Sequence, residues 1–590
     1  MKTASGRIVA GVERGVPFRF VVDGEPVEAY PGETIATALI AANRRTARRT
    51  AHRSSARGVF CAIGVCHDCR MIVDGEANVR SCLVSAGEGM VVETQLGFGR
   101  AATPEPHAER RAAVTASSAP EVVVVGAGPA GIRAAVEAAA AGARVWLLDA
   151  EPRPGGQIYR QLPPEIRPAG RDPLGASRTK SRPLLAGLAR AGVTVLSGAE
   201  VWGVLPERVL LVHHGGRAAV LQAGALVLAT GAYDRPAAMP GWTLPGVVTA
   251  GGVTALVKAQ RVRPGRRVLL AGTGPLLLAA ATALVHGGAH VVGIAEAAPR
   301  RALAGLLRRP GIVGQALEVM RALWGTPIWT RHGLVRIEGT EGVERAIVAR
   351  LDDAWRPVAG TERALDVDTV VLGYGLVPSP ELAELAGCAV AYDAGRGGFV
   401  PMADPEQLMA TSSPGVFVAG DGAGVGGADV AEAQGRLAGL GAACHVGKLG
   451  ATEARARAAP ALRTLRRLAA FRTALERLLA PRPGLHELAT DDTIVCRCEE
   501  VSAGEIRVAI DEGARRVTEV RAVTRAGMGL CQGRMCVPTV AGLLARWAGV
   551  TPETAGRLPP RLPARPVPIS VLMDPVLESV AAPTREARRR

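Results

Sequence analysis

Apolar residues along the chain gather in short unbroken runs, and two of these runs precede a glycine-rich turn. The run at 122–125 consists of valine only and leads through glycines into an alanine-rich stretch, and the run that starts at Val268 has the same layout. A strand that is buried on both faces of a sheet carries no polar positions, so each run predicts a parallel strand followed by a helix. Two such units predict an α/β core with two dinucleotide-type domains.

A different pattern occupies the first hundred residues. Apolar and polar positions alternate at 18–22 and 27–30 on either side of an Asp23-Gly24 turn, which predicts two paired strands. A short apolar helix follows Thr34. A loop rich in arginine at 44–57 then leads to the first cysteine, and it is interpreted as a solvated surface or a docking patch.

Changes of composition divide the chain. The predicted units are a first domain over 1–100, a linker over 101–119, a first dinucleotide domain over 120–246 and 371–450, a second one inserted over 247–370, a helical segment over 451–488, a small helical domain over 489–550, and a mobile or docking tail rich in Pro and Arg over 551–590.

Charge and hydropathy exclude two classes of protein. The formal net charge is +16, but the arginines are scattered and no aromatic side chains are interleaved with them, so we expect no nucleic-acid binding. The uncharged stretch 268–285 is interrupted by Gly272, Gly274 and Pro275, so we expect no transmembrane segment. The first 15 residues lack the apolar core of a secretion signal. A cytoplasmic protein is expected, which reaches an inner membrane face only peripherally.

Eight of the ten cysteines form two groups with iron–sulfur spacing. The first group reads C-x4-C-x2-C-x12-C, the spacing of a plant-type [2Fe–2S] loop, and the second reads C-x-C-x32-C-x4-C. Zinc sites usually pair C-x2-C with a second C-x2-C or with His, so structural zinc is the weaker alternative in both places. The predicted iron ligands are Cys61, Cys66, Cys69 and Cys82 in the first group, and Cys496, Cys498, Cys531 and Cys536 in the second.

The first glycine turn is accompanied by further signals of a flavin dinucleotide. Glycines allow the turn to approach a pyrophosphate, and an acid at the end of the next strand accepts hydrogen bonds from ribose hydroxyls. Later motifs favour FAD over NAD here. The predicted FAD-binding residues are Gly126, Gly128, Pro129, Ala130, Gly131, Asp149, Gly156, Gln157, Thr230, Gly231, Gly420 and Asp421.

The second glycine turn departs from the pattern. Gly272, Gly274 and the acid Glu296 suit NAD, but Leu277 stands where a third glycine is wanted. Either this is a working NAD site, or the fold is retained and holds another nucleotide or nothing. Disulfide reduction is excluded, because Gln157 follows Gly156 where no cysteine pair is found.

These motifs resemble known families. Residues 15–98 are similar to the ferredoxin-like small subunits of hydrogen cyanide synthase and D-hydroxyproline dehydrogenase. Residues 121–550 resemble the flavin-binding large subunits of heteromeric amine and amino-acid dehydrogenases, among them opine oxidase, hydrogen cyanide synthase and the front half of the sarcosine oxidase large subunit. The second cysteine group resembles bacterioferritin-associated ferredoxin domains, in the C-Q-G-x-x-C variant.

The resemblance implies a multidomain α/β fold. It consists of an N-terminal β-grasp plant-type ferredoxin-like domain, a two-dinucleotide-domain flavoprotein core and a small helical [2Fe–2S] domain. It also implies FAD and two [2Fe–2S] clusters, and leaves NAD, FMN or ATP open at the second site or at a partner interface. The implied partner is an FAD-containing oxidase-like subunit that oxidises a C–N bond, and the electrons continue to a quinone or another respiratory acceptor.

Two other functions remain open at this stage. One is an NADH-dependent reductase that feeds an external acceptor through the clusters. The other is a redox-sensing scaffold whose clusters are structural. The sequence identifies neither a substrate nor a catalytic residue.

Overall fold

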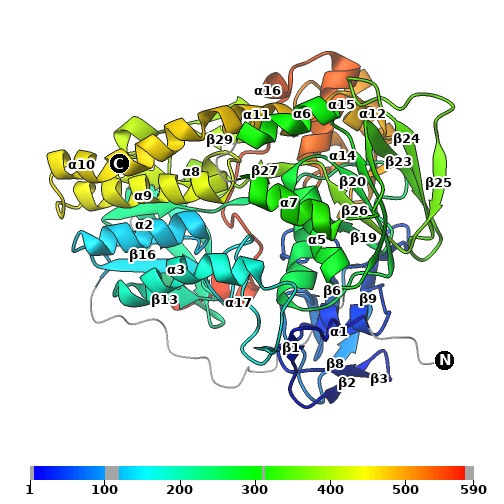
Figure 1. The fold of residues 1–590 in the computed structure, drawn as a ribbon, viewed down its shortest axis with the longest axis horizontal. Helices are drawn as coiled ribbons and strands as arrows, with labels where there is room; N and C mark the ends of the chain where they lie inside the picture. Colours follow the sequence, from blue (N-terminus) through cyan, green and yellow to red (C-terminus); the bar gives the residue numbers. More distant parts are fainter. Residues whose placement is uncertain (1–5, 100–118, 309–311, 578–590) are drawn as a thin grey trace.

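The computed structural model of the chain describes residues 6–99, 119–308 and 312–577. In Figure 1 the first domain is blue, the helices of the last domain are orange, and the two dinucleotide units, in cyan, green and yellow, occupy the rest of the molecule. The predicted linker at 101–119 lies outside the described residues, apart from its last residue.

The first domain is a mixed five-stranded sheet with one helix against it. The sheet has the order β3-β2-β8-β6-β7, in which β2 is antiparallel to β3 and parallel to β8. Phe20, Leu39 and Met71 lie in its core, and the Thr34 hydroxyl caps α1. This arrangement confirms the predicted β-grasp. The elements are β2 (Phe18–Val22), β3 (Glu25–Ala29), α1 (Ile35–Ala41), β6 (Arg70–Val73), β7 (Glu76–Arg80) and β8 (Val91–Glu93).

The first dinucleotide unit is built on a seven-stranded sheet. Its strand β10 (Val122–Val125) is buried throughout and lies between β11 (Val145–Asp149) and β17 (Ala225–Leu228), parallel to both. Helix α2 (Pro129–Ala140) follows β10 through the glycine turn, and α9 (Ala428–His445) lies beside α2 (Figure 1). The unit therefore has the predicted strand–turn–helix order.

The second dinucleotide unit has a five-stranded parallel sheet in the order β19-β26-β20-β21-β22. Three of its strands are β19 (Val247–Thr249), β21 (His290–Glu296) and β22 (Ile328–Thr330). Helix α5 (Pro275–His286) follows β20 (Arg267–Gly272), as predicted. Strand β26 (Thr369–Gly373) lies inside this sheet, between β19 and β20. The unit therefore extends to residue 373 and not to 370, because the chain crosses back to the flavin unit only after this strand is complete.

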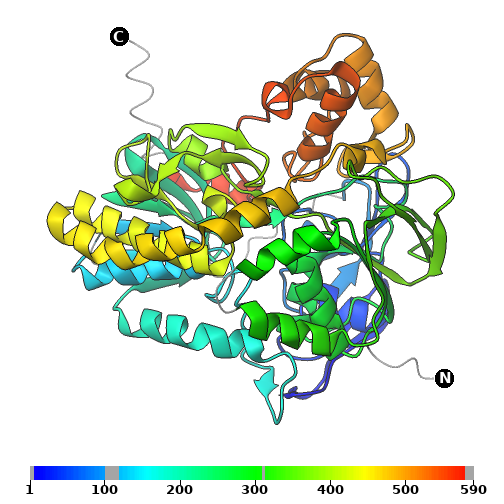
Figure 2. The ribbon, with the colours of Figure 1, turned by 45° about the horizontal axis from the view of Figure 1, so that its top comes forward.

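The helical segment and the last domain follow. Helices α10 (Ala451–Arg467) and α11 (Ala469–Leu479) lie along the two dinucleotide units, and the last domain stands beside them (Figure 2). Ser502 and Glu505 form a capping box at the start of the first helix of that domain. Its helices are α13 (Ala503–Asp511), α14 (Val517–Thr524) and α15 (Val537–Ala548).

The segment 551–577 is attached to the first dinucleotide unit. The amide of Ala564 donates to the carbonyl oxygen of Trp202 at 2.7 Å, and Arg217 pairs with Asp574 at 3.2 Å. Val571 is fully buried. The tail was predicted to be mobile or docking. For these residues the structure shows docking, because apolar side chains among the prolines pack on the sheet surface. The remainder of the tail, 578–590, lies outside the described residues.

Membrane crossing is tested by helix length and hydropathy. Within 6–99, 119–308 and 312–577, every helix falls short of what a bilayer span requires.

Candidate flavin and iron–sulfur sites

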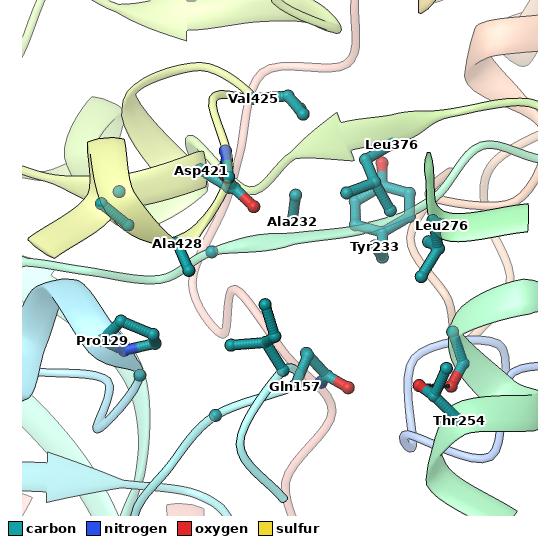
Figure 3. A pocket seen from close by; sticks show the side chains of 18 of the residues that line it. Pro129, Gln157, Ala232, Tyr233, Thr254, Leu276, Leu376, Asp421, Val425 and Ala428 are labelled. Carbon is teal, nitrogen blue, oxygen red and sulfur yellow. Dashed lines mark hydrogen bonds between the residues drawn. The ribbon is translucent and has the colours of Figure 1, made fainter. Parts of the chain in front are cut away.

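A cavity of about 1430 Å³ lies between the two dinucleotide units. Figure 3 shows Pro129, Gln157 and Asp421 around one part of it, and Thr254 and Leu276 on the opposite side. It exceeds the ~300–1,000 Å³ of most small-ligand pockets, so it has room for a dinucleotide. The predicted FAD residues that line it are Gly126, Gly128, Pro129, Ala130, Asp149, Gly156, Gln157, Thr230, Gly231, Gly420 and Asp421.

The glycine turn of this site is tightly built. A Cβ atom added to Gly156 would lie 2.7 Å from the Cα of Gly128, so the two turns meet with no room for side chains. Gly131 does not line the cavity. A side chain there would collide with the carbonyl oxygen of Gly126, so this glycine serves the packing of helix on strand.

Asp149 closes β11 at the edge of the cavity. Its carboxylate accepts hydrogen bonds from the amides of Ala127 and Glu151, the latter at 2.7 Å. Burial raises the pKa of Asp149 to about 6, although both amide bonds act in the other direction. The position at the strand end fits an acid that accepts from the ribose of a bound dinucleotide.

Asp421 and the start of α9 form another wall. Oδ1 of Asp421 accepts from the amides of Gly426 at 3.0 Å and Gly427 at 3.2 Å. Gly427 and Ala428 line the cavity at the N-terminus of α9. A helix N-terminus carries a partial positive charge, so this wall favours an anionic group.

The glycines of the second turn are covered by another part of the chain. Gly272, Thr273 and Gly274 are buried, and Glu296 is fully buried with its oxygens bonded to the amides of Gly274 at 3.1 Å and Ala298 at 2.9 Å. By contrast, Gly126 and Gly128 of the first turn are partly open to the cavity.

Helix α11 provides the cover. A Cβ atom added to Gly274 would lie 2.9 Å from Cδ2 of Leu479 and 3.7 Å from Cδ2 of Leu478. None of Gly272, Gly274 and Glu296 lines the cavity at the flavin site. Thr273 and Pro275 of the turn do line the cavity. The two glycines and the acid that suit NAD do not, so this arrangement disfavours NAD at the second turn.

The cysteines of the first group are buried and arranged in two pairs. The thiols of Cys61 and Cys66 are hydrogen-bonded to each other, and so are those of Cys69 and Cys82. Burial raises the pKa of Cys61, but hydrogen bonds from Cys66 and from backbone amides outweigh it and lower the pKa to about 7. Amides aimed at a sulfur stabilise a thiolate, the form that binds iron.

The second group repeats the pairing. Cys496 pairs with Cys536, and Cys498 pairs with Cys531. A hydrogen bond with the Cys536 thiol is the main cause that lowers the pKa of Cys496 to about 7. A side chain at Gly529 would collide with Cβ of Cys498, so the loop needs glycine there.

The arrangement of the cysteines in pairs distinguishes an iron–sulfur cluster site from a site for a single metal ion. Within the described ranges, three or more His, Cys, Asp or Glu side chains are nowhere gathered as for one ion. A [2Fe–2S] cluster takes two thiolates at each of its two irons, so two pairs fit it better than they fit structural zinc.

The sequence prediction missed Asp234. It lines the cavity and accepts from the Thr249 hydroxyl and the Gly251 amide, both at 2.9 Å. It follows the predicted Thr230-Gly231 turn closely, which was the available signal. The Arg-rich loop was predicted as a solvated surface or a docking patch. A solvated surface is wrong for Arg48 and Arg57, since both are buried.

Comparisons with known proteins agree with this geometry. Residues 15–97 match a 2Fe-2S iron-sulfur cluster binding domain, 120–435 match the pyridine nucleotide-disulphide oxidoreductase family, and 494–546 match a BFD-like [2Fe-2S] binding domain. Fold and site thus define an FAD-dependent oxidoreductase with two [2Fe–2S] domains, and they confirm the predicted fold class and cofactors.

The relatives narrow this class. The chain is 35% identical to an opine oxidase subunit of Rhizobium meliloti, over 77% of this chain and 87% of that one. It is 34% identical to hydrogen cyanide synthase subunit HcnB of Pseudomonas aeruginosa, over 77% and 98%. The chain therefore belongs to the family of these flavoprotein subunits, within the pyridine nucleotide-disulphide oxidoreductases.

A solved structure shares the architecture. L-proline dehydrogenase from P. horikoshii superposes with a TM-score of 0.67 at 21% identity, over 97% of this chain and 100% of that one. At this identity the likeness concerns the fold.

Proposed function

We propose that this chain is the FAD and iron–sulfur subunit of a heteromeric dehydrogenase that oxidises an amino acid or a secondary amine to an imine. One observation carries the proposal: the flavin cavity is bordered directly by the first cysteine loop. Ile63 and Val65, which lie between Cys61 and Cys66, line the same cavity as Asp149. A two-electron site therefore adjoins a one-electron site within one chain.

The chain's own residues define what it contributes. Bound FAD accepts electrons in pairs and releases them singly, and the clusters carry one each. The apolar side chains of Ile63 and Val65 line the cavity beside the cysteine loop. Asp149 and the α9 N-terminus orient the dinucleotide, and the cysteine pairs hold the iron.

The substrate class and the partner rest on the relatives. The opine oxidase and hydrogen cyanide synthase relatives are both named as subunits, and their names refer to nitrogen-containing substrates or products. We expect the C–N bond to be oxidised in an oxidase-like partner that carries its own FAD. The electrons then leave this cytoplasmic subunit for a quinone or another respiratory acceptor.

The covered glycine and the buried acid of the second turn argue against an NADH-dependent reductase. Leu478 and Leu479 cover Gly274, and Glu296 is fully buried. We expect that NADH added anaerobically to the purified chain leaves the flavin absorbance unchanged in stopped-flow spectroscopy. Rapid bleaching of the flavin band would instead favour the reductase.

The test of the proposed function compares the chain with and without its partner. Purified alone, the chain should contain FAD and iron but oxidise no amino acid. Mixed with an oxidase-like subunit that carries its own FAD, it should accept electrons from an amino acid or secondary amine, seen as bleaching of flavin and cluster absorbance. Turnover of an amino acid by the single chain, or colourless protein without iron, would contradict the proposal.

A further inference from the structure

The two cysteine loops are joined by a buried ion pair. Asp68 lies between Cys66 and Cys69, and Arg497 lies between Cys496 and Cys498. Nε of Arg497 donates to Oδ2 of Asp68, and both side chains are at most 1% exposed. The residue enclosed by one loop thus contacts the residue enclosed by the other, although they are more than four hundred positions apart in sequence.

Two aromatic rings fix the guanidinium group. The Cζ atom of Arg497 lies 4.1 Å from the ring centre of Phe60 and 4.6 Å from that of Trp242. The two rings meet edge to face at 5.7 Å, and Phe60 is the residue before Cys61. A second bond, from Nη1 of Arg497 to the carbonyl oxygen of Trp242 at 2.8 Å, removes the remaining freedom.

The surroundings of the pair are positively charged. Arg48 also donates to Asp68, at 2.8 Å, and the nearby Arg57 is buried too. Arg70, which follows Cys69, is buried as well. The ion pair is therefore surrounded by buried arginines of the first domain.

The same interface is otherwise apolar. One cluster of buried side chains contains Cys61 and Cys66 together with Cys496, Cys531 and Cys536. At its margin Glu500 accepts from the Thr50 hydroxyl at 2.6 Å and from the amide of His52 at 2.7 Å, which ties the basic loop to the last domain.

We propose that Asp68 and Arg497 are positioning residues that hold the two cysteine loops in direct contact, so that electrons pass from one cluster to the other across this pair. The inference rests on the proposed function, because it assumes that both loops carry [2Fe–2S] clusters. One electron crosses at a time: the donor cluster is oxidised by one electron, the acceptor cluster is reduced by one, and no bond is formed or broken.

The arginine has an electrostatic role as well. Reduction of a cluster adds negative charge, and a buried cation nearby stabilises the reduced form. Loss of the Arg497 charge should therefore make both clusters harder to reduce.

The test uses electron paramagnetic resonance on the full chain, reduced with dithionite under anaerobic conditions. Two reduced clusters in contact should show spin–spin broadening and fast relaxation, and redox titration gives a midpoint for each cluster. Arg497→Gln should weaken the spin–spin interaction and shift both midpoints to more negative values. Arg497→Lys keeps the charge and should restore the midpoints.

A matched control tests an exposed pair of the same domain. Arg507 pairs with Asp491, and their side chains are 45% and 51% exposed, so Arg507→Gln should change neither signal. Iron analysis of every variant shows whether both clusters are present. If Arg497→Gln loses iron, the spin–spin interaction and the midpoints of the wild type and of Arg497→Lys still test the proposal.

The outcomes separate the two proposals. A wild-type protein with two reducible but magnetically isolated clusters overturns the contact between them and leaves the proposed function intact. Midpoints that stay constant in Arg497→Gln overturn the role of the arginine. A chain without reducible clusters overturns the proposed function itself.

Discussion

At the scale of single residues, equivalent positions in the two dinucleotide units have different roles. Asp149 and Glu296 both end the second strand of their unit and both accept a hydrogen bond from the glycine turn. Asp149 borders the cavity, whereas Glu296 is fully buried. The acid thus belongs to the fold of both units, but a dinucleotide can reach it only in the unit where it borders the cavity.

The cysteine assignment is tested by iron content. If each group holds one [2Fe–2S] cluster, Cys496→Ser should retain about half of the iron of the wild type, because two of about four irons per chain are lost. Cys388→Ser is the control, since this buried thiol contacts Thr411 outside both groups and should keep all iron. Colorimetric iron analysis gives the answer, and unchanged iron in Cys496→Ser would exclude the residue as a ligand.

Asp234 predicts a pH dependence. Burial raises its pKa from 3.8 to about 6, so the folded chain holds this proton more tightly than the unfolded chain. The free energy of unfolding therefore falls as the pH rises from about 4 to about 6, and it stays level above that range. Asn cannot ionise, so Asp234→Asn should gain about 1 kcal/mol relative to wild type between about pH 5 and pH 8.

Chemical unfolding at both pH values measures this difference. Asp353→Asn serves as the control for the amide substitution, because that side chain is 77% exposed. If the free energy of unfolding of Asp234→Asn differed from that of the wild type by the same amount at both pH values, the pKa of Asp234 would not be raised.

At the scale of elements, the contact of α2 with α9 places the flavin site. A Cβ atom added to Gly435 or Gly439 would strike the backbone of Ala130 or Ala134, so the two helices approach closely only because α9 carries glycine there. The close approach brings the N-termini of both helices to the same cavity. The spacing of small residues along α9 is thus a requirement of the binding site as well as of packing.

Substitution of these glycines should be costly. Gly435→Ala is expected to destabilise the protein by about 1 to 3 kcal/mol through overpacking and to lower the FAD content. Gly187→Ala is the control, because nothing lies within 4 Å of a Cβ atom added in helix α3 (Ala176–Arg190). That control should be neutral or stabilising by up to about 1 kcal/mol. Thermal unfolding and the flavin-to-protein absorbance ratio compare the two, and similar values for both would contradict the packing argument.

At the scale of the whole molecule, the sequence predicts the parts better than their contacts. Local patterns located β10 and the residues of the flavin cavity, because strand–turn–helix motifs and cysteine spacing are short-range signals. The cover of α11 over Gly274 and the Asp68–Arg497 pair join segments that are distant in sequence. No periodicity records such contacts, and the basic loop was therefore predicted as a solvated surface or a docking patch although Arg48 is buried.

Trp242 should stabilise the first domain and the last domain together. It is 1% exposed, its ring contacts Phe60 and Arg497, and its indole donates to the carbonyl oxygen of Ile494 at 2.6 Å. We expect Trp242→Ala to cost about 3 to 5 kcal/mol and to release both clusters in a single transition. Visible absorbance during heating follows the clusters.

Trp324→Ala is the matched control for this substitution. Trp324 is 89% exposed, so its truncation should change stability by less than about 0.5 kcal/mol. Two separate cluster-loss transitions in Trp242→Ala would show that the two ends are stabilised independently.

The seating of residues 6–99 against the last domain has a kinetic consequence. Because both belong to one polypeptide, their meeting is intramolecular, and a tether of this kind produces an effective concentration in the millimolar range. Docking between the two carriers then needs no search through solution, and its rate does not depend on how much protein the cell makes. Dilution should leave the rate of electron transfer within the chain unchanged, while it slows electron transfer to a separate protein.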